Sequence, residues 1–403
     1  MRITRNSRWL MLLLAVTLLL ISVTPACTPK QAKTIKIGQT MDLTGPIAAS
    51  GKILVEDGQW ITKYINDVKG GLDGAKLEWL WADDAFSPPR TISAFQRMKE
   101  DGIVVIIVQN STSALALTPI AERAQVPIIS MNAEPSSLYP PGWVYLAFPT
   151  ANADLFVGAL TFIKQNWKGD QPPKIAIMGW DNSLGRSTLN AKKYWEDLGI
   201  QVVTQDFLPP TAVDWSTPLV KARDAKADFI FVSNSHPASE FVLRDAERLG
   251  IRGKIPIIMN GISVQIDDSI DAAGALTEGI YWIIPWNLSP DTAGIKEFME
   301  AQQKVTGKEP RLRSSSMHVW GALNVATEAI KRASKNVGVD KVTGAEVKKA
   351  LDSFKDFDTG GITPPITYGT DNRRGGSAVW AYQVKNGRVT PVSKQITVPF
   401  VKP

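Results

Sequence analysis

Residues 102–133 read GIVVIIVQNSTSALALTPIAERAQVPIISMNA, and this stretch decides the fold class. Ile103 to Val108 is an unbroken apolar run of β-branched residues, which is typical of a strand buried on both faces of a parallel sheet. A helical spacing of apolar residues follows, and Val126 to Ile129 has the composition of the next strand. The order strand, helix, strand predicts a parallel βαβ unit.

The polar loop between that first strand and its helix is a candidate binding site. Five polar residues, Gln-Asn-Ser-Thr-Ser, occupy positions 109–113 at the carboxyl end of the strand. Ligands of open parallel sheets bind at this end, where helix N-termini offer free N–H groups. Serine and threonine are also favoured N-caps, so the loop has two interpretations, a helix cap and a ligand contact.

The N-terminus has the pattern of an export signal. Three arginines precede an apolar run over residues 9–23, which is long for a signal core and short for a membrane span. Cys27 is the only cysteine, and its place after this run resembles the acylated cysteine of bacterial lipoproteins, although Thr24 and Pro25 depart from that motif. An ordinary cleaved signal is the alternative. We expect a signal peptide at 1–26 and a lipidated Cys27 with its tether at 27–33.

Composition and motifs exclude several function classes. The chain has 45 Lys and Arg against 39 acids, and the basic count falls to 42 once residues 1–26 are removed. No basic block with interleaved aromatic residues is present, so we expect no nucleic-acid partner. Two histidines and one cysteine make a metal site improbable, and we expect no cofactor.

Catalytic motifs are also missing from the sequence. Gly45 and Gly51 are separated by five residues where the phosphate-binding loop needs four. Asp83 and Asp84 are adjacent on an extended segment and point to opposite faces, so we expect a structural role for them and not paired acid–base chemistry. We therefore predict that the chain is not an enzyme.

The βα rhythm of the first half is repeated in the second half. We expect an α/β protein of two doubly wound parallel-sheet lobes joined by a multi-strand hinge, because the chain shows two similar series and then returns. The predicted first lobe comprises 34–150 plus 285–360, and the second comprises 151–284 plus 361–403.

Several short motifs carry a resemblance that covers nearly the whole mature chain. Thr40 to Pro46 with Gly51 resembles the opening "LTGP…G" of the type I periplasmic binding proteins, the branched-chain amino-acid class. Further matching motifs, in order, are Asp83-Asp84, Val126 to Ser130, Phe148 to Thr150 and Lys308 to Pro310.

This resemblance implies a function. Such proteins capture a small solute outside the cytoplasm, between two hinged lobes, and deliver it to the permease subunits of an ABC importer. We expect a monomer, anchored to the cell membrane by Cys27 or free in the periplasm. A ligand-sensing receptor or regulator of the same fold is the alternative.

The resemblance also implies site residues. Ser111 matches the serine that grips the α-carboxylate in relatives that bind leucine-type amino acids. Other family contacts are changed. Glu134 stands where relatives have a threonine, and the position of the acid that receives the ammonium in relatives falls at or next to Asn260. Two tyrosines and an aromatic residue are replaced as well. The candidate ligand contacts are Ser50, Asn110, Ser111, Thr112, Asn132, Ala133, Glu134, Leu184, Ser235 and Asn260.

These changes predict an altered ligand preference. Glu134 beside Ser111 would repel a carboxylate, and an ammonium group would lack its acid near Asn260. A neutral amide, a cation, or an amino compound held differently suits these groups better than a standard branched-chain amino acid. Most of the tryptophans are expected in the core, and Trp180 is the one to test as a wall of the cleft. We expect His318 to lie at the surface or in the core.

Overall fold

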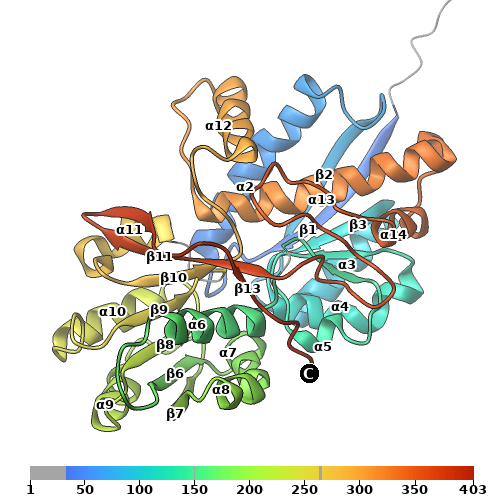
Figure 1. The fold of residues 1–403 in the computed structure, drawn as a ribbon. Helices are drawn as coiled ribbons and strands as arrows, with labels where there is room; N and C mark the ends of the chain where they lie inside the picture. Colours follow the sequence, from blue (N-terminus) through green and yellow to red (C-terminus); the bar gives the residue numbers. More distant parts are fainter. Residues whose placement is uncertain (1–32, 149, 263–265) are drawn as a thin grey trace, which may run out of the picture. The chain divides into compact units, whose positions relative to one another are not determined.

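The computed structural model describes residues 33–148, 150–262 and 266–403 (Figure 1). The expected signal peptide and Cys27 lie outside the described residues. Residues 34–403 form one compact unit, and all statements below concern it.

The first sheet has the strand order β2-β1-β3-β4-β5, and every neighbouring pair is parallel. All residues of β3 are buried: Val105 and Ile107 contact one hydrophobic cluster, and Ile106 and Val108 contact another. The prediction that this strand is buried on both faces is therefore confirmed. The strands are β1 Thr34–Met41, β2 Lys76–Asp83, β3 Ile103–Val108, β4 Ile128–Ser130 and β5 Val144–Leu146.

Helices cover both faces of this sheet. α3 and α4 pack against each other and against β3, while α2 packs along α13, and α14 contacts β3 (Figure 1). We call this sheet with its helices the first lobe. Its helices are α2 Ala48–Lys63, η1 Tyr64–Val68, α3 Pro88–Glu100, α4 Ser111–Ala124, α5 Pro135–Leu138, α12 Ala293–Thr306, α13 Ser314–Val337, η4 Val339–Lys341 and α14 Gly344–Asp352.

The second sheet has the order β12-β11-β10-β9-β8-β6-β7. It is parallel from β7 to β10, but β11 runs antiparallel to β10 and forms a hairpin with β12. The sheet is thus mixed and not purely parallel, because the returning chain adds a C-terminal hairpin at its edge. Its strands are β6 Lys174–Trp180, β7 Gln201–Leu208, β8 Phe229–Ser233, β9 Ile257–Asn260, β10 Tyr281–Ile284, β11 Ala378–Lys385, β12 Arg388–Pro391 and β13 Ile396–Thr397.

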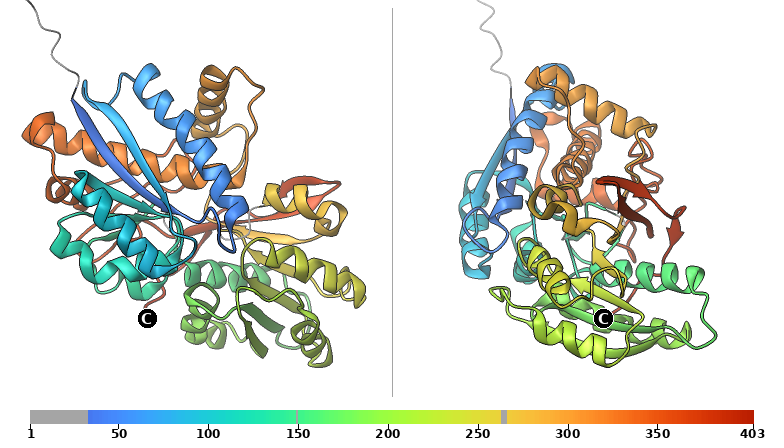
Figure 2. Two further views of the ribbon diagram at one scale, coloured as in Figure 1. Left: turned by 180° about the vertical axis from the view of Figure 1, so that it is seen from behind. Right: turned by 90° about the vertical axis from the view of Figure 1, so that its left-hand side faces the viewer.

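The helices of this second lobe lie against its sheet. α6 packs beneath β9, β10 and β11, and α9 packs against β7 and α10. Figure 2 shows, from behind and from the side, that β6 to β10 gather with these helices apart from the first sheet. The helices are α6 Asn152–Asn166, α7 Ser183–Arg186, η2 Ser187–Ala191, α8 Lys192–Asp197, α9 Ser216–Asp224, α10 Ala238–Arg248, α11 Ile266–Ala273 and η3 Gly274–Thr277.

The chain passes between the lobes three times: between β5 and α6, between β10 and α12, and between α14 and β11. The predicted two-lobed α/β fold is confirmed. The exact lobe boundaries given above stay a prediction.

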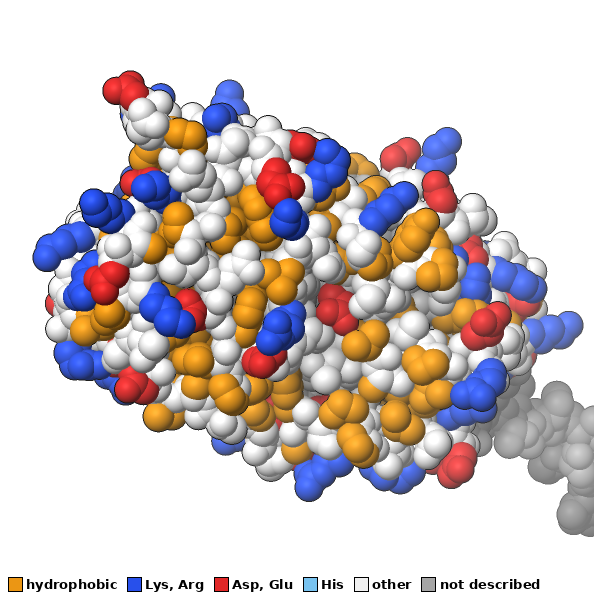
Figure 3. All heavy atoms as spheres, turned by 90° about the horizontal axis from the view of Figure 1, so that it is seen from below, with side chains coloured by type: hydrophobic (Ala, Val, Ile, Leu, Met, Phe, Trp, Pro, Cys, Tyr) orange, Lys and Arg blue, Asp and Glu red, His pale blue; other side chains and the backbone are white. Residues whose placement is uncertain are grey.

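The surface carries charges of both signs. Among the described residues on the face seen from below in Figure 3, basic and acidic side chains are interspersed with apolar ones and are not gathered into one field.

Candidate functional site

The loop after β1 forms one wall of the site. Asp42 is fully buried, and its carboxylate accepts hydrogen bonds from the N–H groups of Gly45 (2.5 Å) and Ile47 (3.1 Å). Burial raises the pKa of Asp42, and these two N–H groups oppose the rise. The hydrogen bonds turn the chain into α2, whose first turns then direct Ser50 and Leu54 toward the end of the sheet.

The loop after β2 is held in an unusual conformation by two aspartates. Ala85 (φ 49°) and Phe86 (φ 58°) lie in the left-handed region, which costs a non-glycine residue about 1–3 kcal/mol. Asp83 accepts the N–H of Ala85 at 2.9 Å, and Asp84 accepts that of Phe86 at 3.2 Å. The predicted structural role of these aspartates is confirmed, and its effect is to place the Phe86 ring at the site.

The loop after β3 contains the N-cap of α4. The Oδ1 atom of Asn110 accepts the N–H of Ser113 at 2.8 Å, so Asn110 is the N-cap of α4. The Ser113 hydroxyl donates to Asp84 at 2.8 Å and thereby ties this loop to the preceding one. Ser111 is the first residue of the helix, and its hydroxyl is directed to other contacts.

The second lobe supplies the opposite wall. Trp180 ends β6, and Leu184 lies in α7, where Asn182 caps the helix by accepting the N–H of Gly185 at 3.2 Å. A Cβ atom on Gly185 would lie 2.0 Å from the carbonyl oxygen of Trp180, so this tight loop requires glycine. Ser235 follows β8 and completes this wall.

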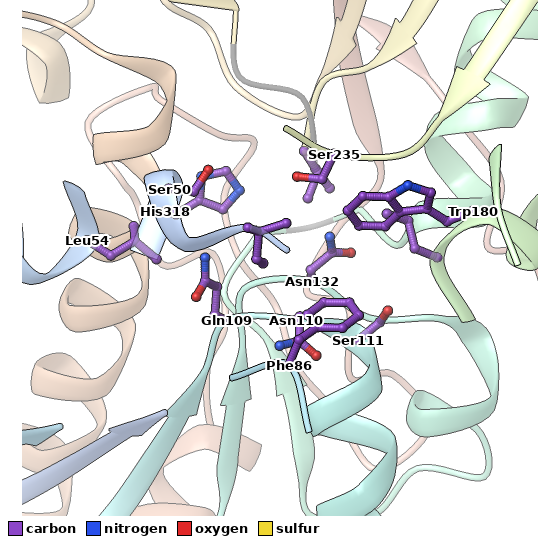
Figure 4. Close-up of a pocket in the computed structure, with 13 residues that line it drawn as sticks. Ser50, Leu54, Phe86, Gln109, Asn110, Ser111, Asn132, Trp180, Ser235 and His318 are labelled. Carbon is purple, nitrogen blue, oxygen red and sulfur yellow. The ribbon is translucent and has the colours of Figure 1, made fainter. Parts of the chain in front are cut away.

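A cavity of about 40 Å³ lies between these loops (Figure 4). In the close-up, the ring of Trp180 reaches in from one side, and Asn132 and Gln109 approach from the loops of the first lobe. The lining consists of Ile47, Ser50, Leu54, Phe86, Gln109, Asn110, Ser111, Asn132, Trp180, Leu184, Ser235, Ile262 and His318.

The two lobes touch directly beside this cavity. The hydroxyls of Ser111 and Ser183 are 2.8 Å apart, and that of Thr112 is 3.3 Å from the same Ser183 oxygen. The rings of Phe86 and Trp180 meet edge to face with centroids 6.1 Å apart. These contacts join residues of α4 and the β2 loop to residues of β6 and α7, so the described conformation is closed over the cavity.

His318 comes from α13 and lies in the core at the back of the cavity. Its ring packs edge-on against Phe148 (5.5 Å between centroids) and Trp286 (4.9 Å). Burial lowers the pKa of His318 from 6.5 to about 4, so the ring is neutral at neutral pH. Of the two positions expected for His318 from the sequence, surface or core, the core is the one observed.

The sequence-predicted contacts divide into two groups. Six of them line the cavity, namely Ser50, Asn110, Ser111, Asn132, Leu184 and Ser235. Four do not, namely Thr112, Ala133, Glu134 and Asn260.

The four outlying residues have other contacts. The carbonyl of Ala133 accepts the N–H of Asn152 at 3.0 Å, and the carbonyl of Glu134 accepts that of Ser137 at 3.2 Å. Glu134 precedes α5, and burial raises the pKa of its carboxyl group. Asn260 is fully buried, and its Oδ1 accepts the N–H of Ile262 at 3.2 Å. The sequence-based picture of Glu134 as a wall of the pocket therefore differs from the observed lining.

Several lining residues were not identified from the sequence. Gln109 belongs to the quoted polar loop and could have been included on that ground. Phe86 gave no signal, because its position depends on the left-handed backbone after Asp84. Ile47, Leu54, Ile262 and His318 have the spacing of ordinary core residues and are brought together only by the tertiary fold.

Within the described ranges, no group of three or more His, Cys, Asp or Glu side chains could hold a metal ion. None of the helices in those ranges combines the length and the apolarity needed to span a membrane.

Comparison with known proteins identifies the family. A family model described as "Periplasmic binding protein" matches residues 34–388. The chain belongs to the periplasmic binding proteins. Its resemblance to the type I, branched-chain amino-acid class is confirmed by relatives and by solved structures. This family consists of solute-binding proteins and not enzymes, and membership implies an extracytoplasmic location.

Three similar proteins illustrate the match. The leucine-, isoleucine-, valine-, threonine- and alanine-binding protein of Pseudomonas aeruginosa is 25% identical over 328 residues, which are 80% of this chain and 83% of that protein. A branched-chain amino acid ABC transporter protein from Thermus thermophilus with bound valine superposes with a TM-score of 0.81 at 21% identity, covering 91% of this periplasmic binding protein and 97% of that chain. A fatty acid ABC transporter substrate-binding protein from Thermomonospora curvata gives 0.79 at 21% identity, with coverage of 91% and 92%.

Proposed function

We propose that this periplasmic binding protein captures a small polar solute, such as an amino acid, an amide or a related compound, for an ABC importer. The observation that carries the proposal is the closed cavity between the loops of the two sheets. Its lining combines Ser50 and Asn132 of the first lobe with Leu184 and Ser235 of the second, so opening at a hinge would expose it.

A second pocket offers the solute a route inward. This pocket of about 760 Å³ shares Ser50 with the cavity and lies between the start of α2 and the residues His236, Glu240 and Asp268 of the second lobe. A solute entering here would meet the cavity lining when the lobes separate. The direct contacts of Ser183 with Ser111 and Thr112 would then re-form behind it.

We also propose the lobe boundaries, the ligand contacts and the N-terminal processing of the chain. The lobes are 34–150 plus 285–360 and 151–284 plus 361–403, with ligand contacts at the six predicted residues that line the cavity. Residues 1–26 are removed, Cys27 is lipidated, and the protein acts as a membrane-anchored monomer that delivers its solute to permease subunits.

The decisive experiment is native mass spectrometry of the purified protein. The proposal expects a small-molecule adduct that is lost on unfolding and restored when the released fraction is added back to refolded protein. A protein that never carries or rebinds a small molecule would contradict solute capture.

Transport is distinguished from sensing in the cell. Deletion of the gene should reduce uptake of the solute identified in the adduct, because an importer depends on its binding protein. Unchanged uptake with altered gene expression would favour the sensor instead.

A further inference from the structure

The cavity lining is uncharged. Within the described residues, it includes no Lys, Arg, Asp or Glu side chain. Its one ionisable residue is His318, and burial lowers the pKa of that ring to about 4, so it is neutral at physiological pH. An ionised group of a ligand would therefore find no opposite charge among these side chains.

The groups behind the lining are acidic. Asp42, Asp83 and Asp84 lie directly beneath the first-lobe loops, and their carboxylates already accept hydrogen bonds from backbone N–H groups. The adjoining pocket is lined by Glu240, Asp268 and Asp271 together with Arg313 and His236, and Arg311 also pairs with Asp271 at 2.8 Å. This arrangement disfavours a carboxylate in the cavity. It also leaves an ammonium group without a lining acid to pair with.

The orientation of two side-chain amides supplies the lining with hydrogen-bond donors. Gln109 Oε1 accepts the N–H of Asp42 at 2.8 Å, and Asn110 Oδ1 accepts that of Ser113 at 2.8 Å. Both oxygens are thus engaged by the backbone, and the N–H₂ groups remain as donors. Among the described lining residues, Asn110 Nδ2, Trp180 Nε1 and His318 Nδ1 are buried without a hydrogen-bond partner, and the first two are N–H donors. A buried donor left unsatisfied is destabilising, and a ligand oxygen would satisfy it.

The rest of the lining sets the shape and size of the ligand. Ile47, Leu54, Leu184 and Ile262 offer apolar contact. The cavity volume of about 40 Å³ has room for about three water molecules, at roughly 10–15 Å³ each. A short aliphatic body with one polar group fits this space better than a leucine-sized zwitterion.

From this combination we infer that the cavity selects small uncharged solutes that carry a carbonyl acceptor on a short aliphatic body, with simple carboxamides as the best match. The inference rests on the proposed solute-binding function and narrows it to one chemical class. The inference disfavours amino acids as ligands because they are zwitterions, and moving an uncompensated charge from water into the cavity is costly.

The test is calorimetric titration with four compounds of similar size and different charge. Propionamide is neutral, propionate is an anion, propylamine is a cation and alanine is a zwitterion at pH 7.5. Propionamide should bind at least about 100-fold more tightly than the other three, because each carries an unpaired charge into the cavity. Equal or tighter binding of a charged compound would overturn the inference, and so would binding of none of the four.

Two pairs of variants test the donors. Asn110→Asp keeps an oxygen to cap α4 but replaces the amide N–H₂ with a charge, and it should weaken propionamide binding at least about tenfold. Asn182→Asp is the matched control, because Asn182 caps α7 in the same way, also has a buried Nδ2 without a partner in the described ranges, and does not line the cavity.

The second pair concerns the indole groups. Trp180→Phe removes the N–H and keeps a ring, and it should weaken binding about threefold to tenfold. Trp215→Phe makes the same change at another fully buried indole, which is outside the lining, and should leave binding unchanged. Equal effects within either pair would overturn the role of that donor. Native mass spectrometry tests solute capture separately, so a retained adduct of a charged compound would contradict this inference and leave the proposed function intact.

Discussion

The hydroxyl of Ser111, at the first turn of α4, lies 2.8 Å from the hydroxyl of Ser183, at the start of α7. The first residue belongs to the first lobe and the second to the opposite lobe. A serine hydroxyl has one donor and two acceptor positions, so this contact still leaves Ser111 capacity to bind a ligand. The same atom can therefore link closure of the lobes to occupation of the cavity.

The first prediction concerns this contact. Ser183→Ala removes the hydrogen bonds to Ser111 and Thr112 and should shift the ligand-free protein toward the open form. The change is worth about 0.5–1.5 kcal/mol for a typical hydrogen bond. Small-angle X-ray scattering should detect a larger radius of gyration. Ser93→Ala is the control, because the Ser93 hydroxyl bonds to Pro89 within α3; an unchanged radius in both variants would contradict the prediction.

The second prediction is that leucine, isoleucine and valine are not preferred ligands. A bound α-amino acid needs partners for a carboxylate and an ammonium, and the described lining has neither a cation nor an acid. Calorimetric titration with each of the three should show no binding at micromolar concentration. Micromolar binding of any of them would show that the charges are satisfied by groups other than these side chains.

The parts of the fold that depend on local patterns are predictable from the sequence. The run from Ile103 to Val108 is apolar at every position, so burial on both faces follows from composition alone. The polar loop after this strand and Ser235 both lie at the carboxyl ends of parallel strands. Ligands of parallel sheets bind at these ends, so both positions can be predicted without knowing the tertiary structure.

The remainder of the site depends on geometry that no local pattern contains. Phe86 reaches the cavity because Asp84 stabilises a left-handed turn, and such turns are uncommon for residues other than glycine. Glu134 has the sequence position of a ligand contact, but α5 begins directly after it and the residue is absent from the lining. His318 is far in sequence from the first-lobe loops that line the cavity, and the packing of α13 brings it next to them.

The third prediction concerns membrane anchoring. Cys27 lies outside the described residues, so this prediction is based on the sequence alone. Cys27→Ser should abolish incorporation of labelled palmitate and move the protein from the membrane to the soluble fraction, since acyl chains supply about 0.8 kcal/mol of membrane affinity per buried methylene. Unaltered labelling or membrane association would show that the cysteine is not the anchor point.

The last prediction is a pH dependence that originates at His318. Its pKa is about 4 in the folded protein and 6.5 ordinarily. Between these values the unfolded chain binds a proton that the folded protein does not, so stability is complete above about pH 6.5 and is lost as the pH falls toward 4. The loss between pH 7 and pH 5 is about 2 kcal/mol from this group.

Comparison with His318→Gln isolates this contribution. The variant should be less stable at pH 7, because it loses ring contacts with Phe148 and Trp286. Its free energy of unfolding should nevertheless fall by about 2 kcal/mol less than that of the wild type between pH 7 and pH 5. Asp154, whose pKa burial raises to about 6, acts in the opposite direction but is present in both proteins and cancels. Urea titrations at the two pH values measure the difference, and parallel losses in both proteins would mean that His318 is protonated in the folded state.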